Sequence, residues 1–144
     1  MDSLRVIVVG GGIGGIACGV ALARESIEVE VVEQAAELRE IGAGLQVAAN
    51  AMKALRHWGL EDKVREVSVA SESVIFRDLA TGEHLFATPL GAAAGQRYGA
   101  VLQQIHRADL LNILGRALPD DTLRLNARVA GGFHSQPGST PCPR

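Results

Sequence analysis

The residues best placed to do chemistry form a glycine cluster that directly follows an apolar, β-branched run at residues 6–9. Gly10, Gly12 and Gly15 have the spacing G-x-G-x-x-G, and a helix-like pattern of small residues follows them. Glycines at these places permit a tight turn off a strand, a close approach of the backbone to a pyrophosphate, and close packing of the helix on the strand. The first turn of that helix would present unpaired N–H groups and a partial positive charge to phosphate oxygens. The pattern therefore predicts phosphate binding at this loop.

An acidic residue completes the pattern at the end of a second β-rich run. Residues 29–32 lead into Glu33, which lies 18 residues past Gly15. A carboxylate there accepts hydrogen bonds from ribose hydroxyls and repels a 2′-phosphate. The order of strand, turn, helix, strand and acid thus predicts a site for an adenosine without a 2′-phosphate, as in FAD or NAD. The alternative is a βαβ unit that binds nothing, although each glycine inside an element would then weaken it by about 0.5–1 kcal/mol relative to alanine.

The composition and residue spacing of the chain argue against nucleic-acid binding, a membrane span and a metal site. A chain of 144 residues suits one domain, and a net charge of −2 with 3% aromatic residues gives no support to nucleic-acid binding. Residues 6–23 are uncharged and about long enough to cross a membrane, but their glycines and β-branched run favour strand and turn. The cysteines and histidines have no metal-ligand spacing, and Cys18, among small helix residues, is expected to be buried. We therefore expect a cytoplasmic protein with no metal, membrane or nucleic-acid partner.

The elements that must position these residues follow in order along the chain. Asn50 is expected to cap a helix that carries Ala51, Ala54, Leu55 and Trp58 on one face and ends before Gly59. The further expected elements are a short helix over 62–67, a β-hairpin of strands 73–78 and 83–88, a flexible loop over 91–95, an extended segment over 98–105, a helix that begins at 106–109 and stops at Pro119, and a last strand over 122–129. Residues 130–144 are rich in glycine, proline and serine, which predicts a disordered tail after a domain formed by residues 1–129.

Two further places have residue types that suit a ligand. Gly42 and Gly44 flank Ala43 in an apolar setting, which fits either a second close approach of the backbone to a ligand or a simple loop turn. Arg107 lies at the start of an expected helix, where the helix dipole disfavours a cation. A residue kept against that preference is a candidate for binding an anion.

Three blocks of sequence carry a resemblance to a known family. They are VIVVGGGIGGIACGVAL with VEVVE, then ELREIGAGLQVAANAMKALRHWGL, then RYGAVLQQIHRADLLNIL. With these blocks the chain resembles the N-terminal part of the class A FAD-dependent aromatic hydroxylases, especially the salicylate hydroxylase-like group. The first block alone would suit many FAD or NAD enzymes, whereas the second and third are more specific. The resemblance implies an α/β fold: a Rossmann-like FAD-binding βαβ domain with a small β-hairpin insertion, incomplete relative to the family.

The resemblance also implies which residues hold the cofactor. The backbone of Gly10, Gly12, Ile13, Gly14 and Gly15 would hold the FAD pyrophosphate, and Glu33 with Gln34 would bind the adenosine ribose. Arg39 resembles a family arginine near the flavin, and the loop of Gly42, Ala43 and Gly44 would pass close to it. Arg107 would reach the FAD phosphates or ribitol chain. In such enzymes NADH or NADPH reduces the flavin, and molecular oxygen then serves to hydroxylate a small aromatic substrate.

The chain also departs from the family. Family members run to several hundred residues and carry an Asp-Gly motif and a later Gly-Asp motif, neither of which occurs here. The change of composition near Val129 leads us to expect a truncated or frame-shifted product. Three hypotheses follow: the FAD-binding portion of a monooxygenase, a catalytically inactive FAD-binding remnant, or another FAD or NAD oxidoreductase that shares only the first βαβ unit. No residue is expected to be a catalytic acid, base or nucleophile, and the sequence leaves the substrate and the oligomeric state open.

Overall fold

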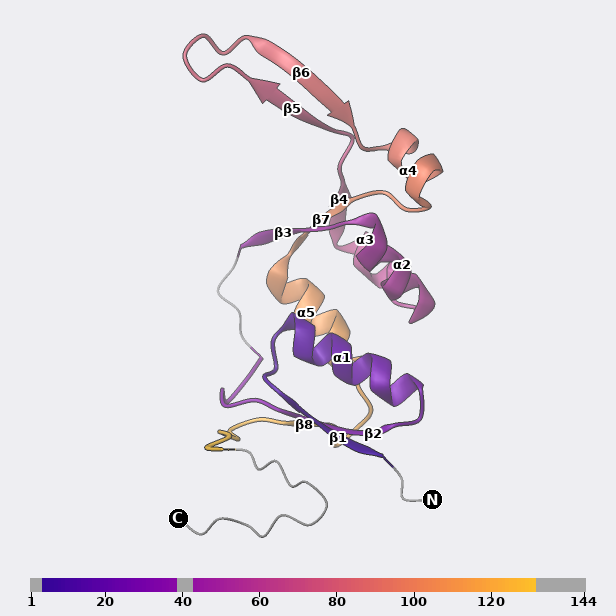
Figure 1. The fold of residues 1–144 in the computed structure, drawn as a ribbon, viewed down its shortest axis with the longest axis vertical. Helices are drawn as coiled ribbons and strands as arrows, with labels where there is room; N and C mark the ends of the chain where they lie inside the picture. The colour runs from indigo at the N-terminus through magenta and orange to yellow at the C-terminus, as the bar shows by residue number, and fades with distance from the viewer. Residues whose placement is uncertain (1–3, 39–42, 132–144) are drawn as a thin grey trace, which may run out of the picture.

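The structure, a computed structural model, describes residues 4–38 and 43–131. Its N-terminal part is a βαβ unit of β1 (Arg5–Val9), α1 (Ile13–Arg24) and β2 (Glu28–Val32), as Figure 1 shows. β1 and β2 are parallel, with Val8 opposite Val31, and β8 (Leu123–Arg124) adds to the other side of β2 in parallel. The strand order β1-β2-β8 places the carboxyl ends of all three strands at one edge of the sheet.

Small residues let α1 lie close against this sheet. A Cβ atom built at Gly15 would be 1.9 Å from the backbone oxygen of Gly10, and one built at Gly19 would be 2.7 Å from Val31 Cγ2. Ile16 and Val20, on the same side of the helix, are buried. The glycines of α1 therefore bring the helix close to the strands.

The second part of the fold is a small antiparallel sheet with its own helices. Its strands are β3 (Gly44–Val47), β7 (Gln103–His106) and β4 (Ser68–Ala70), in the order β3-β7-β4. The helices α2 (Ala49–His57) and α3 (Glu61–Glu66) connect β3 to β4, and α5 (Arg107–Gly115) follows β7 directly. Met52, Leu111 and Leu114 are almost fully buried and join Ile16 and Val31 in one hydrophobic cluster, so the two sheets share a core.

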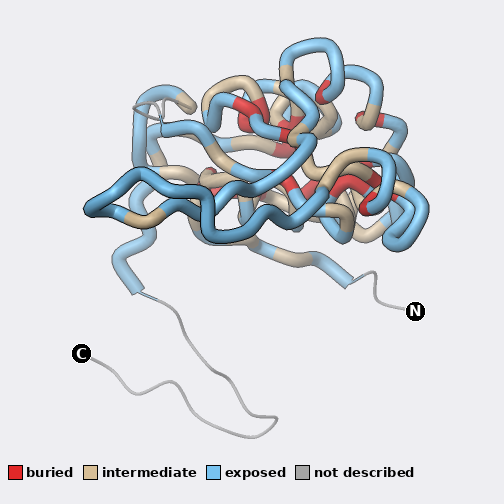
Figure 2. The backbone as a smooth tube through the Cα atoms, turned by 90° about the horizontal axis from the view of Figure 1, so that it is seen from above, coloured by how far each residue is buried: buried red, intermediate tan, exposed pale blue. Residues whose placement is uncertain are grey.

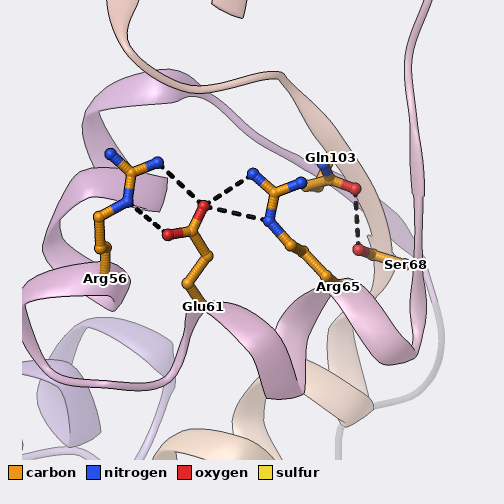
Figure 3. Close-up of polar contacts among 5 residues, drawn as sticks. All are labelled: Arg56, Glu61, Arg65, Ser68 and Gln103. Atoms are coloured by element: carbon orange, nitrogen blue, oxygen red, sulfur yellow. Dashed lines mark hydrogen bonds and ion pairs between the residues drawn. The ribbon is translucent and has the colours of Figure 1, made fainter.

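Polar contacts fix the connection between α2, α3 and the second sheet. Glu61 accepts hydrogen bonds from the guanidinium groups of Arg56 and Arg65, and Ser68 donates one to Gln103 across 3.0 Å, as Figure 3 shows. Gln103 is 2% exposed, so its amide needs such a partner. These contacts lie away from the carboxyl edge of the first sheet and have a structural role.

A β-hairpin extends from this body. It consists of β5 (Ser73–Arg77) and β6 (His84–Pro89), after which α4 (Ala92–Tyr98) leads back to β7. Every residue of the two strands is exposed, whereas the buried residues, red in Figure 2, lie inside the body. Phe76 and Phe86 stack across the hairpin with 4.4 Å between ring centroids. Such a cross-strand aromatic pair stabilises the hairpin.

The expected α/β class, the βαβ unit and the small hairpin are confirmed, but several details of the sequence-based prediction are wrong. Asn50 does not cap α2, because Ala48 occupies the N-cap and the helix begins at Ala49. Residues 91–95 were expected to be a loop, but α4 begins at Ala92 and buries Ala94. β8 is two residues long rather than eight. Cys18 is exposed because α1 turns Ile16, Gly19 and Val20 toward the core instead.

Three further expectations concern the end of α2, membrane-spanning helices and the C-terminal tail. Gly59 follows α2 with φ +69°, as expected for a residue that ends a helix. Within the described ranges, none of the helices is both long and apolar enough to cross a membrane. The expected tail falls mostly on residues 132–144, outside the described residues, so the division into a domain and a tail stays a prediction.

Candidate functional site

The glycine loop begins where β1 ends. Gly10 has φ +107°, and its N–H donates a hydrogen bond to Val32 O across 2.8 Å. A Cβ atom at Gly10 would have no neighbour within 4 Å. Glycine is therefore required there because residues with a Cβ rarely adopt this backbone conformation, and not because space is lacking.

The N-terminus of α1 follows this turn directly. Gly12 is the N-cap in an extended conformation, no side chain caps the helix, and the first helical hydrogen bond runs from Ile16 N–H to Gly12 O at 2.9 Å. The N–H groups of Ile13, Gly14 and Gly15 come before that bond, in a helix of 12 residues. Such groups, together with the helix dipole, favour an anion. A Cβ at Gly14 would meet nothing within 4 Å, so there is open space beside this turn.

Glu33 lies beside the loop, immediately after β2. Its Oε2 accepts a hydrogen bond from Gly11 N–H across 2.5 Å, and its Oε1 accepts one from Ala35 N–H across 2.8 Å. Backbone hydrogen bonds from Ala35, Gly11 and Gln34, in that order of importance, hold the pKa of Glu33 below its usual range. The carboxylate is therefore ionised at neutral pH and held in a fixed position against the glycine loop.

A cavity of about 350 Å³ opens at this edge of the sheet. Its lining residues come from the ends of β1 and β2 and from the segment after β8: Val9, Gly10, Val32, Glu33, Gln34, Ala127, Arg128 and Val129. Open α/β sheets bind ligands outside the carboxyl ends of their strands, which is where this cavity lies. The structure thus brings together the predicted residues Gly10, Glu33 and Gln34.

The wall formed by residues 127–129 was not predicted from the sequence. Those residues were interpreted as the end of a strand and given no role. Their signal was nonetheless present, because the carboxyl end of a third parallel strand reaches the same edge as the ends of the first two.

The residues predicted to lie near the flavin are at the second sheet, which contains β3 and β7. β3 pairs with β7 so that Gly44 is opposite His106, and Arg107 N–H donates a hydrogen bond to Ala43 O across 3.2 Å. Ala43, Gly44 and Arg107 are thereby brought together, at the point where α5 begins. A Cβ at Gly44 would meet nothing within 4 Å, so no protein atom near it requires a glycine. Arg39 and Gly42 lie outside the described residues.

The residues present suit the adenosine and phosphate portion of a dinucleotide. Gly10 turns the chain with a positive φ, and a Cβ atom at Gly15 would lie only 1.9 Å from Gly10 O, so the loop and the helix pack closely because Gly15 has no side chain. No side chain caps the helix, so none occupies its N-terminus. The ionised Glu33 beside them suits ribose hydroxyls and opposes a 2′-phosphate.

Comparison with known proteins agrees with this geometry. A family model described as the FAD binding domain matches residues 3–121, most of the chain. The chain belongs to this FAD binding domain family. The expected cofactor, FAD, is thereby confirmed at the level of the family.

Individual relatives of this FAD binding domain are aromatic monooxygenases. The 6-hydroxynicotinate 3-monooxygenase of Pseudomonas fluorescens is 40% identical over 122 residues, which cover 85% of this chain and 32% of the relative. The 3-hydroxybenzoate 6-hydroxylase of Polaromonas naphthalenivorans (strain CJ2) is 41% identical over 107 residues, which cover 74% of this chain and 27% of the relative. The expected family of FAD-dependent aromatic hydroxylases is therefore confirmed. The chain spans between a quarter and a third of the length of these two relatives.

A solved structure shows the same fold. The crystal structure of Klebsiella pneumoniae HpxO, complexed with FAD and uric acid, matches with a TM-score of 0.77 and 27% identity over 90% of this chain and 32% of that one. The FAD binding domain described here therefore corresponds in fold to part of a flavin-containing protein.

Proposed function

We propose that this chain is the FAD-binding portion of a monooxygenase that hydroxylates a small aromatic compound with molecular oxygen, using NADH or NADPH as the reductant. The observation that carries the proposal is the position of Glu33, ionised and bonded to Gly11 N–H beside an uncapped helix N-terminus. The two relatives described above, named as a 6-hydroxynicotinate 3-monooxygenase and a 3-hydroxybenzoate 6-hydroxylase, support the type of reaction.

Each group of residues has a defined part in binding. The N–H groups of Ile13, Gly14 and Gly15 donate hydrogen bonds to phosphate oxygens, and the helix dipole stabilises their negative charge. Gly11 N–H donates to Oε2 of Glu33 and Ala35 N–H donates to Oε1, and an ionised carboxylate, which has about four lone-pair sites, can also accept a hydrogen bond from a ribose hydroxyl. When bound, FAD supplies the redox chemistry that takes reducing equivalents from the nicotinamide and activates oxygen.

The flavin end of the site is proposed to lie at the junction of β3 and α5. Ala43 and Gly44 offer exposed backbone there, and Arg107 adjoins them through its bond to Ala43 O. Arg107 would contact the phosphates or the ribitol chain. The roles of Arg39 and Gly42 near the flavin stay predictions.

The proposed substrate is a hydroxylated aromatic carboxylate of the salicylate type. The relatives are named for 6-hydroxynicotinate and 3-hydroxybenzoate, both of which are rings with a hydroxyl and a carboxyl group. The narrower expectation of salicylate itself, and the choice between NADH and NADPH, stay predictions. A cytoplasmic location also stays a prediction.

The test is to add FAD to the purified chain, measure binding by quenching of flavin fluorescence, and follow NADH and NADPH oxidation with salicylate, 3-hydroxybenzoate and 6-hydroxynicotinate. Glu33→Ala should weaken FAD binding about 10- to 100-fold, the usual worth of hydrogen bonds to a charged group. Glu28→Ala is the matched control, because Glu28 lies at the opposite end of β2 and pairs with Arg5 on the surface. A chain that binds no FAD would refute the proposal.

A second candidate function is an FAD-binding chain without activity of its own. The matched residues amount to 32% and 27% of the two relatives described above, so most of each relative lies outside the match. FAD binding that depends on Glu33, with no oxidation of NADH or NADPH above a blank, would support it. Turnover with any of the three aromatic acids would support the enzyme instead.

A further inference from the structure

The cavity beside Glu33 has a wall that the dinucleotide fingerprint does not include. After β8 the chain turns at Asn126, which has φ +55°, a left-handed conformation that asparagine tolerates better than most residues. Asn126 N–H donates to Ala35 O across 3.0 Å, and Ala127 N–H donates to Glu33 O across 2.9 Å. These two bonds tie the segment to the end of β2 and fix where the next residue, Arg128, begins.

Arg128 is an exposed cation in this wall, and it lines the same cavity as Gly10 and Glu33. Other arginines of this sheet are engaged: Arg124 pairs with Glu30, and Arg5 pairs with Glu28. Across residues 4–38 and 43–131, Arg128 has no ion pair or side-chain hydrogen bond. The nearby carboxylate of Glu33 is already held by the N–H groups of Gly11 and Ala35.

The covalent order of a nucleotide indicates which part of it would reach Arg128. The N–H groups of the α1 N-terminus suit the phosphates, and Glu33, bonded to Gly11 in the loop, suits the ribose that follows them. The base is attached to the ribose on the side away from the phosphates. Arg128 belongs to the wall on the β8 side of Glu33, so the base is the part nearest to it.

We propose that Arg128 positions the adenine base, with its planar guanidinium lying against the face of the purine ring. The inference rests on the proposed function, since it takes the cavity to hold the adenosine of FAD. Arginine suits this role because its delocalised, weakly hydrated cation stacks on aromatic faces, whereas the compact ammonium of lysine stacks less well. No residue expected from the fingerprint contacts the base, so Arg128 would add selectivity for adenine over smaller ligands.

The test measures binding of ADP, FAD and inorganic pyrophosphate to the 144-residue chain by isothermal titration calorimetry, with variants Arg128→Ala, Arg128→Lys and Arg124→Ala. Arg128→Ala should weaken ADP and FAD about three- to tenfold, within the range expected for a cation over an aromatic ring, and Arg128→Lys should not restore the loss. Pyrophosphate has no base, so its affinity should be the same in Arg128→Ala as in the original chain. Arg124→Ala makes the same change of charge on the same segment and should leave all three ligands within twofold.

The outcomes separate this inference from the proposed function. Unchanged ADP affinity in Arg128→Ala overturns the role of Arg128 and leaves FAD binding in place. Full restoration by Arg128→Lys, or a parallel loss of pyrophosphate binding, shows a point charge acting on phosphate and also overturns the stacking role. If the original chain binds neither ADP nor FAD, both proposals are overturned.

Discussion

Two neighbouring glycines in the first turn of α1 should respond in opposite ways to the same substitution. Gly14 and Gly15 are the second and third residues of the helix, and both have helical backbone. A methyl group at Gly14 would have no neighbour within 4 Å, whereas one at Gly15 would lie 1.9 Å from Gly10 O. The difference between the two positions is therefore entirely one of space.

The expected magnitudes follow from these distances. Alanine removes the conformational freedom of glycine, so Gly14→Ala should stabilise the chain by up to about 1 kcal/mol. Gly15→Ala brings the same gain, but the contact must open from 1.9 Å to at least 3.0 Å, the lower limit for real Cβ atoms. Gly10 is held by its 2.8 Å bond to Val32 O, so the strand and the helix must separate. Overpacking costs about 1–3 kcal/mol and a lost hydrogen bond about 1 kcal/mol, so the net destabilisation should be about 1–3 kcal/mol.

The assay is urea unfolding of both variants, followed by far-ultraviolet circular dichroism and by the fluorescence of Trp58, the only tryptophan in the chain. We expect the midpoints to move in opposite directions at an unchanged m-value. Equal stability of Gly14→Ala and Gly15→Ala would refute the close approach of α1 to Gly10 and, with it, the steric reason for the third glycine of the motif.

Three further outcomes follow from the structure. The pKa of Glu61 is lowered to about 2, chiefly by its hydrogen bond from Arg56 and then by that from Arg65. The contribution of this ionised carboxylate to stability is therefore present above its ordinary pKa of 4.5 and is lost as the pH falls toward about 2. In acid titrations monitored by circular dichroism, Glu61→Gln should lack this part of the pH dependence of stability. Leu111 is 1% exposed in the shared core, so Leu111→Ala should cost about 2–5 kcal/mol in urea unfolding, and a smaller loss would indicate that the core is loosely packed there. Ile7 is 59% exposed and lies on β1, the edge strand of the first sheet. Because an exposed apolar edge strand promotes association, sedimentation velocity should show self-association of the chain that Ile7→Lys reduces. A chain that stays monomeric at high concentration would contradict this.

The βαβ unit could be predicted because its signals are local. A β-branched run, glycines at fixed spacing and a second β-rich run each specify their own backbone conformation, and β1, α1 and β2 lie where these signals place them. The same holds for the hairpin, whose turn residues separate two short runs of apolar residues.

The second sheet could not be predicted in the same way. β3 and β4 have four and three residues, and both exist because they pair with β7, which is far from them in sequence. Gln46 and Gln104 lie opposite each other in that sheet, so the strands lack the apolar run that would have identified them. In α4 the glycines of residues 91–95 suggested a loop, but the alanines between them favour a helix and Ala94 is buried.

The candidate site also contains residues that local sequence signals predict and residues that depend on a distant strand. Gly10, Gly15 and Glu33 were identified from spacing alone, because each acts within one βαβ unit. The wall at residues 127–129 depends on β8 reaching β2 from about ninety residues further along the chain. The last strand was expected to run to residue 129, but Asn126 adopts a positive φ and ends the ladder, which turns Arg128 into the cavity wall.

Backbone hydrogen bonds hold both ends of the proposed site. At the adenosine end, backbone hydrogen bonds join three separate segments: Gly11 and Ala35 donate to the Glu33 carboxylate, and Ala127 donates to the Glu33 carbonyl. At the flavin end, the antiparallel pairing of β3 with β7 and the 3.2 Å hydrogen bond from Arg107 N–H to Ala43 O join β3 to the start of α5. A cradle fixed by its own backbone needs little reorganisation to accept a ligand, which lowers the free-energy cost of binding. The adenosine and phosphate portion of the nucleotide should therefore bind with little rearrangement of this chain, with Glu33 as the residue that excludes a 2′-phosphate.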